Sequence, residues 1–332
     1  MLVRIAADRV EVQAPAKLNL FLEILAKRAD GYHEIETLMS RIGLYDSLTF
    51  RGTAKPEIRL KCRWGAGHQP DAQAKETAAQ MLTQNCPNSV AVMSFAGASG
   101  WCENALGDLP PPEKNIVFKA ASLLQQRSGC GRGGEIHLVK RIPSAAGLGG
   151  ASSDAAAVLV AANIAWQLSW SRERLAELAA ELGSDIPFFL GSGSAVCRGR
   201  GEQIEAAGPI HLHVVVARPP VGLSTPQVYK ACRPASTPAS VSKLQSGLSR
   251  GDWNEVKSAL VNRLEEPAAR LTPWIGRLRK EFETAGCIAQ QMSGSGSSYF
   301  GICENARHAR RVAGRLRSKQ VGMVITTTTT MR

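Results

Sequence analysis

The segment PSAAGLGGASSDAAA, residues 143–157, gathers the residue types of a phosphate-binding loop. Its glycines carry no Cβ, so backbone N–H groups can converge on a ligand there. Ser152 and Ser153 follow at the expected start of an alanine-rich helix, where free N–H groups and the helix dipole favour an anion. The glycine spacing matches neither a Walker loop nor the dinucleotide-binding fingerprint. The segment therefore predicts a phosphate site of another kind, or else a capped helix behind a flexible turn.

Two charged residues elsewhere in the chain supply what a phosphate loop lacks for catalysis. Lys17 shares one face of an expected strand with Asn19, although a lone lysine in such a position is usually solvated. Asp185 precedes the apolar run IPFF, so it is either a helix N-cap or a carboxylate at the edge of a dry pocket. A phosphate cradle, a cation and a general base together make up the inventory of phosphoryl transfer.

The elements that position these residues follow from hydrophobic periodicity. Leu18, Leu20, Leu22 and Ile24 alternate with other residues, which predicts a strand over residues 14–25. Further strands are expected over 32–50, 133–143 and 211–217, and helices over 115–127, 150–168, 171–182, 253–265, 274–286 and 306–319. Strands and helices do not alternate regularly, so the predicted fold class is α+β.

Composition narrows the class of protein. The chain has 332 residues, 44 % hydrophobic and 20 % charged, which is typical of a globular protein of about two domains. It contains no apolar run long enough to span a membrane, and its first residues lack the apolar core of a signal peptide. We therefore expect a cytoplasmic protein, and a bacterial one because no transit-like leader is present.

The remaining features carry weaker indications. The formal net charge is +12, and part of it lies on an amphipathic helix expected at residues 306–319, where a solvated basic face is the favoured interpretation. The eight cysteines form no C-x-x-C pair and predict free thiols. His211 and His213 share one side of a strand but lack a third metal ligand. Residues 64–112 predict an insertion, with a short helix near residues 74–84.

Three motifs occur in a fixed order along the chain: PAKLNLFLEI, PSAAGLGGASSDAAA and MSGSGSSYFGI. In type and order they resemble the three motifs of the GHMP kinase superfamily. The segments KRADGYHEIETL, NIVFKAASLL, ELGSDIPFFL and STPQVYK narrow the resemblance to the branch whose substrate is 4-diphosphocytidyl-2-C-methyl-D-erythritol. The resemblance covers most of the chain, except residues 64–112 and the final TTTTTM.

The resemblance implies a two-domain α+β fold. Residues 1–195 would form an ATP-binding domain of the ribosomal protein S5 domain 2 type, interrupted by the insertion at 64–112. Residues 196–332 would form a ferredoxin-like, substrate-side domain whose last strand packs back on the first domain. The implied reaction is ATP-dependent phosphorylation of the substrate's 2-hydroxyl, with Mg²⁺ accompanying ATP and no protein residue assigned as its ligand.

The resemblance also implies a role for each matching residue. Asp185 would be the general base, with Lys17 beside it as its charge partner. The residues implied in ATP binding are Pro143, Gly147, Leu148, Gly149, Gly150, Ser152 and Ser153. The residues implied in substrate binding are Asn19, Tyr32, His33, Thr225, Tyr229, Gly294, Ser295, Gly296 and Ser297. Within that set, Tyr32 and Tyr229 would stack on the cytosine, and its edge would be read near His33.

Two other functions remain open at this point. Another GHMP-type kinase would act on mevalonate, homoserine or a sugar, which offer no base for Tyr32 and Tyr229 to stack on. A non-catalytic nucleotide-binding or RNA-binding protein on the same fold would have no need of both Lys17 and Asp185. The expected partner is thus a small cytidine diphosphate derivative of methylerythritol, with no nucleic acid or membrane, in a monomer or weak homodimer.

Overall fold

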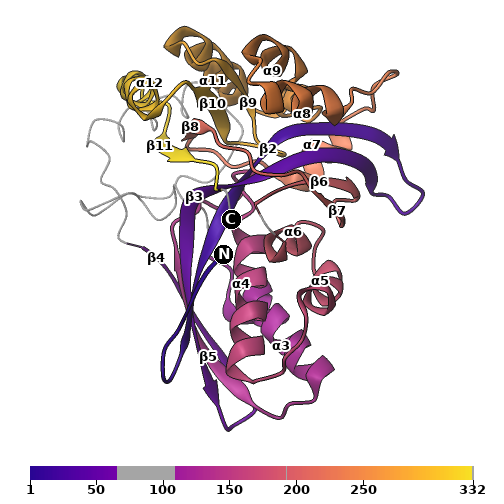
Figure 1. Cartoon of the computed structure of the whole chain (residues 1–332), viewed down its shortest axis with the longest axis vertical. Coiled ribbons are helices and arrows are strands. Elements are labelled where there is room, and N and C mark those ends of the chain that lie inside the picture. Colours follow the sequence, from indigo (N-terminus) through magenta and orange to yellow (C-terminus); the bar gives the residue numbers. More distant parts are fainter. Residues whose placement is uncertain (66–108, 192, 331–332) are drawn as a thin grey trace, which may run out of the picture.

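A computed structural model shows two β-sheets stacked end to end, with helices beside each of them (Figure 1). It describes residues 1–65, 109–191 and 193–330. The short helix expected near residues 74–84, and most of the expected insertion, lie outside the described residues. The mixture of helices with sheets that are antiparallel apart from the parallel β4–β5 pair agrees with the α+β class expected from the sequence.

The first sheet contains seven strands. They are β1 (Leu2–Ile5), β2 (Val10–Lys27), β3 (His33–Thr53), β4 (Ile58–Trp64), β5 (Gly133–Lys140), β6 (Ser194–Gly199) and β7 (Gln203–Ala206). The main order is β1-β2-β3-β5-β4, with β6 paired to the other end of β3 and β7 to β6. The expected boundary at residues 195 and 196 falls inside β6, and the first sheet continues to Ala206.

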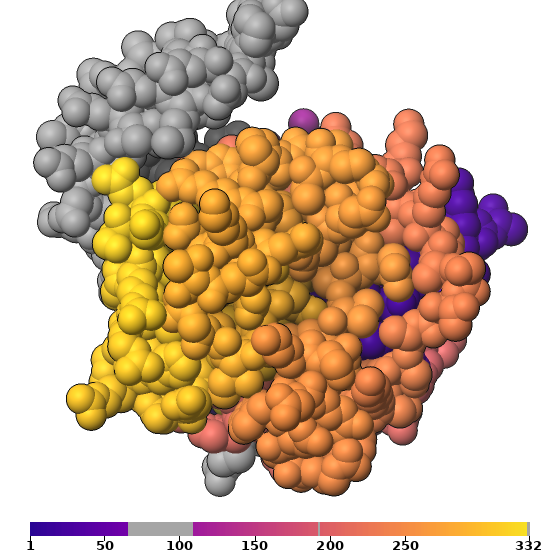
Figure 2. All heavy atoms as spheres, turned by 90° about the horizontal axis from the view of Figure 1, so that it is seen from above, coloured from indigo at the N-terminus to yellow at the C-terminus, as the bar shows by residue number. Residues whose placement is uncertain are grey.

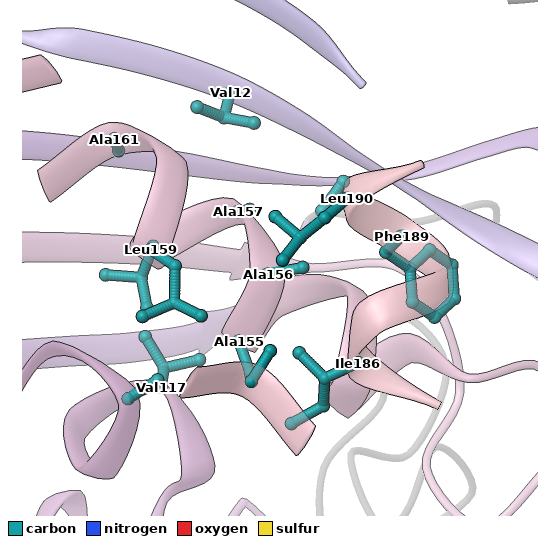
Figure 3. Packing of buried hydrophobic residues seen from close by; sticks show 14 of the residues in the cluster. Val12, Val117, Ala155, Ala156, Ala157, Leu159, Ala161, Ile186, Phe189 and Leu190 are labelled. Atoms are coloured by element: carbon teal, nitrogen blue, oxygen red, sulfur yellow. The ribbon is translucent and has the colours of Figure 1, made fainter. Parts of the chain in front are cut away.

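Helices cover one face of this sheet (Figure 1). They are α3 (Ile116–Ser128), α4 (Gly150–Ala165), α5 (Arg172–Ala180) and α6 (Ile186–Leu190), and a 3₁₀ turn, η1 (Pro112–Lys114), precedes them. The alanines of α4 at positions 155–157, 161 and 162 are small and fully buried, which lets this helix lie close to the sheet and to α6 (Figure 3). α4 ends at Ala165, earlier than the predicted residue 168, because Gln167 adopts a left-handed φ of 59°.

The second sheet is antiparallel, in the order β11-β8-β10-β9. Its elements are β8 (His213–Arg218), α7 (Thr225–Ala231), α8 (Val241–Arg250), α9 (Trp253–Ala259), α10 (Glu265–Leu271), α11 (Pro273–Ala285), β9 (Ala289–Met292), β10 (Tyr299–Cys303), α12 (Ala306–Ser318) and β11 (Met323–Thr328). Seen from above, its orange and yellow atoms cover the molecule, and indigo atoms of the first strands are visible through a gap between them (Figure 2).

The single helix predicted over residues 253–265 is wrong, because the chain leaves the helical path between α9 and α10. There the backbone bonds to β2 instead: the N–H of Leu22 donates to the Val261 carbonyl at 2.7 Å, and the N–H of Arg263 donates to the Leu22 carbonyl at 2.8 Å. Two hydrogen bonds to a long-range partner thus replace helical ones that local periodicity favoured.

β2 passes through three hydrophobic cores in turn. Val12 lies in the core beneath the first sheet, Leu18 in a core shared with the second sheet, and Ile24 in the core beneath α11 and α12. Irregularities in the β2–β3 register, including one between Asn19 and Phe21, change which way the side chains point. The face expected to be polar is therefore buried as well, and Lys17 is only 4 % exposed.

The threonine-rich end of the chain joins the two sheets. β11 pairs with β8 in the second sheet, and beyond it Thr329 forms a bridge with Ile42 of β3. The N–H of Thr330 donates to the Arg41 carbonyl at 2.9 Å, and the Thr329 hydroxyl accepts from the N–H of Leu212 at 2.8 Å. A segment that matched no motif in the sequence is thus a structural connection between domains.

Three smaller predictions can be compared with the structure. α12 is amphipathic as expected, with Val312 and Leu316 buried and Arg310 exposed. The six cysteines within the described residues are all free thiols. The rings of His211 and His213 lie 5.3 Å apart, edge to face, and no group of three metal-ligating side chains occurs in the described parts of the chain.

Candidate active site

A cavity of about 730 Å³ is lined by residues from both domains. Most of the site residues predicted from the sequence line it: Lys17, Asn19, Tyr32, His33, Pro143, Gly147, Leu148, Gly149, Gly150, Ser152, Asp185, Thr225, Tyr229, Gly294 and Ser295. Ser153, Gly296 and Ser297 do not line it and lie behind its wall. Segments far apart in the sequence therefore converge on one hollow, as a ligand site requires.

The first glycine-rich loop, residues 143–150, forms one wall of this cavity and leads directly into α4. Gly149 is the residue before the helix and has a φ of 69°, and the first turn from Gly150 to Ser152 lines the cavity. The first N–H groups of a helix have no partner within it, so they are available to an anion. The N–H of Lys17 donates to the Leu148 carbonyl at 2.9 Å, which fixes the loop beside β2.

Ser153 has a different environment from Ser152. It is fully buried in the first turn of α4, and its hydroxyl has no hydrogen-bond partner within the described structure. Its N–H donates to the Gly149 carbonyl at 2.9 Å, as the helix requires. Of the two serines expected to face a phosphate, only Ser152 reaches the cavity.

Lys17 and Asp185 form an ion pair at the cavity, with 3.7 Å between Nζ and Oδ2. Lys17 is nearly buried and also donates from Nζ to the side-chain oxygen of Asn19. The Asn19 amide donates in turn to the Thr37 hydroxyl at 2.8 Å, so Asn19 orients the lysine. The lysine that sequence alone left as a solvated residue is held by two neighbours.

Asp185 directly precedes α6, but its side chain makes no capping hydrogen bond. The carboxylate is 38 % exposed and lies at the cavity edge, while Phe188 and Phe189 behind it are buried. Of the two interpretations left open by the sequence, the position of the side chain favours the carboxylate at the edge of an apolar pocket.

Aromatic side chains also line the cavity. The rings of His33 and Tyr229 lie 5.4 Å apart with a 45° tilt, and Tyr32 remains 55 % exposed. Burial, with a smaller contribution from Lys27, lowers the pKa of His33, so its ring is neutral at pH 7. The guanidinium of Arg200 lies 5.1 Å from the centre of the Tyr32 ring. Arg200 was missed because it is one arginine among many in a basic chain.

The second glycine-rich loop, residues 293–298, connects β9 to β10. Its first part reaches the cavity, and the Ser295 hydroxyl lies 2.7 Å from that of Thr225 at the start of α7. Its second part faces inward, where the Ser297 hydroxyl donates to the Val221 carbonyl. Asn262 supports the loop by donating from its amide to the carbonyls of Met292 at 2.7 Å and Gly294 at 2.8 Å.

A buried ionic cluster of Lys140, Asp46 and Asp154 lies beneath the first loop. Lys140 donates from Nζ to Asp154 at 2.6 Å and to Asp46, and it also reaches the cavity wall. Burial raises the pKa of Asp154 well above its ordinary value, with Asp46 adding to the rise and Lys140 opposing it. Burial opposes the charge on Lys140, but the two carboxylates raise its pKa above the usual range. The sequence placed these residues in three separate elements, so the cluster was not foreseen.

Two features are absent from the described part of the chain. Within residues 1–65, 109–191 and 193–330, no His, Cys, Asp and Glu side chains gather in threes around a possible metal ion. In the same part of the chain, every helix is too short or too polar to cross a bilayer.

Two family models and several curated proteins match this chain. Residues 115–197 match the family model described as GHMP kinases N terminal domain, and residues 244–321 match that described as GHMP kinases C terminal. A protein of Pelotomaculum thermopropionicum named 4-diphosphocytidyl-2-C-methyl-D-erythritol kinase is 37 % identical, over 95 % of this chain and 96 % of that protein. A protein of Shouchella clausii with the same name is 35 % identical over 93 % of this chain and 91 % of its own length.

Two solved structures superpose on this chain, one at 32 % and one at 18 % sequence identity. The crystal structure of a 4-(cytidine 5'-diphospho)-2C-methyl-D-erythritol kinase superposes with a TM-score of 0.72 and 32 % identity, covering 96 % of this chain and 98 % of that one. A homoserine kinase from Cytophaga hutchinsonii superposes with a TM-score of 0.68 over 99 % and 97 % of the two chains, but at 18 % identity it shows a shared fold alone.

Proposed function

The chain belongs to the 4-diphosphocytidyl-2-C-methyl-D-erythritol kinase family of the GHMP kinases, and we propose that it phosphorylates the 2-hydroxyl of that substrate. Membership makes the chain an ATP-dependent small-molecule kinase with the two-domain fold expected from its motifs. The product would be an isoprenoid precursor, made in the bacterial cytoplasm. The observation that carries the proposal is the Lys17–Asp185 pair, 3.7 Å apart at a cavity that the phosphate loop also lines.

ATP would bind with its phosphates at the first glycine-rich loop. The N–H groups from Gly150 to Ser152 are at the start of a helix, where the dipole and free donors favour phosphate oxygens. Ser152 offers a hydroxyl at the same place, whereas the buried Ser153 supports the helix. Magnesium would enter with ATP, since the phosphates supply oxygen ligands that the described side chains do not gather.

Asp185 would take the proton of the substrate hydroxyl while that oxygen attacks the γ-phosphorus. The new bond joins the substrate oxygen to phosphorus, the bond to the ADP oxygen breaks, and the proton stays on the Asp185 carboxylate until it passes to solvent. Lys17 would stabilise negative charge on the attacking oxygen and favour the ionised carboxylate beside it. Asn19 keeps the lysine in place and lines the substrate side of the cavity.

The cytosine would bind among the aromatic side chains. Tyr32 and Tyr229 offer ring faces, and the neutral His33 offers one donor and one acceptor to the base edge. Arg200 lies over Tyr32 and lines the same cavity, so it can pair with the diphosphate or stack on the base. Mevalonate and homoserine have no group that uses these rings.

The test is turnover of the purified protein with ATP and three alcohols: the cytidyl substrate, mevalonate and homoserine. We expect turnover with the cytidyl substrate alone. In Asp185→Asn we expect kcat to fall by about 100-fold to 10,000-fold, the range of a general base, while ATP binding persists. Asp252→Asn is the matched control, because Asp252 caps α9 and does not line the cavity.

Each other outcome rejects a part of the proposal. Turnover with a different alcohol would retain the phosphate loop and reject the cytosine site. ATP binding without turnover of any alcohol would favour a non-catalytic nucleotide-binding protein. RNA binding that weakens steeply with salt would favour a role for the basic face of α12 instead.

A further inference from the structure

Arg41 is a buried cation without a carboxylate partner. It lies on β3 and is 2 % exposed, and no acidic side chain in the described residues forms an ion pair with it. Burial lowers its pKa to about 10, with Arg172 adding to the effect, so it remains charged at pH 7. A buried charge is costly unless the protein satisfies it, so its contacts indicate what it does.

The guanidinium of Arg41 binds the end of α6. Its Nη2 donates to the carbonyls of Phe188 at 3.0 Å, Phe189 at 2.8 Å and Gly191 at 2.6 Å. The last carbonyls of a helix have no partner within the helix and carry partial negative charge. α6 has only five residues, too few to be stable by itself, so this contact determines where the helix lies.

The other end of α6 is Asp185. In the antiparallel register of β2 and β3, Arg41 is directly opposite Lys17, the partner of Asp185. Two cations from one cross-strand pair therefore contact opposite ends of the same short helix. The position of Arg41 relative to Lys17 is fixed by the sheet, and the length of α6 then fixes where Asp185 lies.

α6 is tightly packed, so little displacement of this helix is possible. The ring of Phe189 is so close to the first loop that a Cβ on Gly149 would lie 2.9 Å from the ring and 2.9 Å from Cγ of Lys17. Ile186, Phe189 and Leu190 of α6 also pack beside the alanines of α4 (Figure 3). A small displacement of α6 would therefore move Asp185, and it would press Phe189 against the loop or Lys17.

We propose that Arg41 is a positioning residue, which holds the last turn of α6 and so sets the distance between Asp185 and Lys17. The inference rests on the proposed function, because it takes Asp185 and Lys17 as the reacting pair. Arg41 does not line the cavity and touches no substrate, so it acts through the helix alone.

The test compares Arg41→Met with Arg41→Lys and with Leu38→Ala. Leu38 is on the same strand and fully buried, but it belongs to the core shared with the second sheet. All variants are assayed at the same temperature, below their unfolding transitions. We expect Arg41→Met to lower kcat at least about 10-fold with KM for ATP within about 3-fold, since small misplacement of a reacting group lowers the rate strongly. We expect Arg41→Lys to recover part of kcat.

Two results would overturn the inference: a folded Arg41→Met with the wild-type kcat, or an equal loss of kcat in Leu38→Ala. Failure of the proposed function is distinguishable. If the wild type phosphorylates another alcohol, the same comparison is made with that alcohol, and if Asp185→Asn keeps its kcat, Arg41 has no reacting pair to position. Should Arg41→Met not fold, Arg41→Lys alone decides, because a lysine reaches fewer of the three carbonyls and must lower kcat.

Discussion

The two glycine-rich loops resemble each other in sequence but do different work. The first loop, residues 143–150, opens into α4 and presents helix N–H groups to the cavity. The second loop, residues 293–298, turns between two strands, and only Gly294 and Ser295 reach the cavity. The first is supported by the buried ionic cluster and the second by the Asn262 amide. A glycine-rich motif thus indicates a phosphate-binding loop more strongly where a helix with free N–H groups follows it.

The glycines themselves differ in what they allow. Gly147 has a φ of 72°, and a Cβ there would lie 2.0 Å from the Ser293 carbonyl oxygen. Glycine at this position lets the two loops approach each other, because no side chain fits between them. Gly296 has a φ of 82°, but a Cβ there would meet the flexible end of Met292 at 2.8 Å. The first loop is thus less tolerant of change than the second.

The largest effect is expected beneath the first loop. Lys140→Met leaves the carboxylates of Asp46 and Asp154 buried without a cation, which should cost about 3–5 kcal/mol of unfolding free energy. Chemical denaturation measures the loss. The double variant Lys140→Met with Asp154→Asn removes one charge and should recover part of it. A loss below about 1 kcal/mol would mean that the cluster does not support the loop.

The next largest effect is expected from alanine substitution of one glycine in each loop, which compares the two loops directly. We expect Gly147→Ala to lower the free energy of unfolding by at least about 2 kcal/mol. A left-handed φ is strained for alanine, and the added Cβ would clash with backbone atoms. Its kcat/KM for ATP should fall about 10-fold or more. Gly296→Ala is the matched control. It should lower the free energy of unfolding by about 1 kcal/mol with little change in the KM for ATP. Equal effects in both variants would remove the distinction between the loops.

A smaller effect is expected from the support of the second loop. Asn262→Ala removes the donor to the Met292 and Gly294 carbonyls. It should lower the free energy of unfolding by about 1–3 kcal/mol. If this loop lines the substrate side as proposed, KM for the alcohol should rise more than KM for ATP. A larger rise in the KM for ATP would place the second loop on the nucleotide side.

The smallest expected effects concern how the free energy of unfolding depends on pH, and Glu23 and Asp154 contribute with opposite signs. The pKa of Glu23 is lowered: burial opposes this, but the Arg263 guanidinium and two backbone N–H groups outweigh it. Glu23 therefore stabilises the fold above its unfolded pKa of about 4.5 and loses that contribution as pH falls. The pKa of Asp154 is raised, so its ionised form destabilises the fold as pH rises above about 3.8.

Stability curves of two amide variants test these signs. The deficit of Glu23→Gln relative to the wild type should grow as pH rises from about 3 to 5. Any deficit of Asp154→Asn should shrink as pH rises from about 4 to 8. If the unfolding free energy of a variant changes with pH in parallel with that of the wild type, the corresponding pKa shift is contradicted.

Short-range patterns predicted much of the fold, and the family resemblance supplied the candidate site residues, most of which line one cavity. The alternating leucines predicted β2, and the glycine-rich segment predicted a loop that leads into α4. Patterns of this kind carry no information about which distant residue will lie opposite. Arg41, Lys140 and Asp154 acquire partners only after the sheet register forms, so no local signal could identify them. The break between α9 and α10 was missed for the same reason, since β2 takes over its hydrogen bonds.

The bridge between Thr329 and Ile42 has a consequence for the order in which the molecule assembles. Nearly the whole chain separates these two residues, and contacts of such long sequence separation form slowly because a large loop must close first. Until β11 arrives, the Arg41 carbonyl lacks the N–H of Thr330, and the middle of β3, which carries Arg41, lacks this neighbour. The proposed reacting pair, Lys17 and Asp185, lies within the first 185 residues, but the strand that carries Arg41 is completed by a threonine near the other end of the chain.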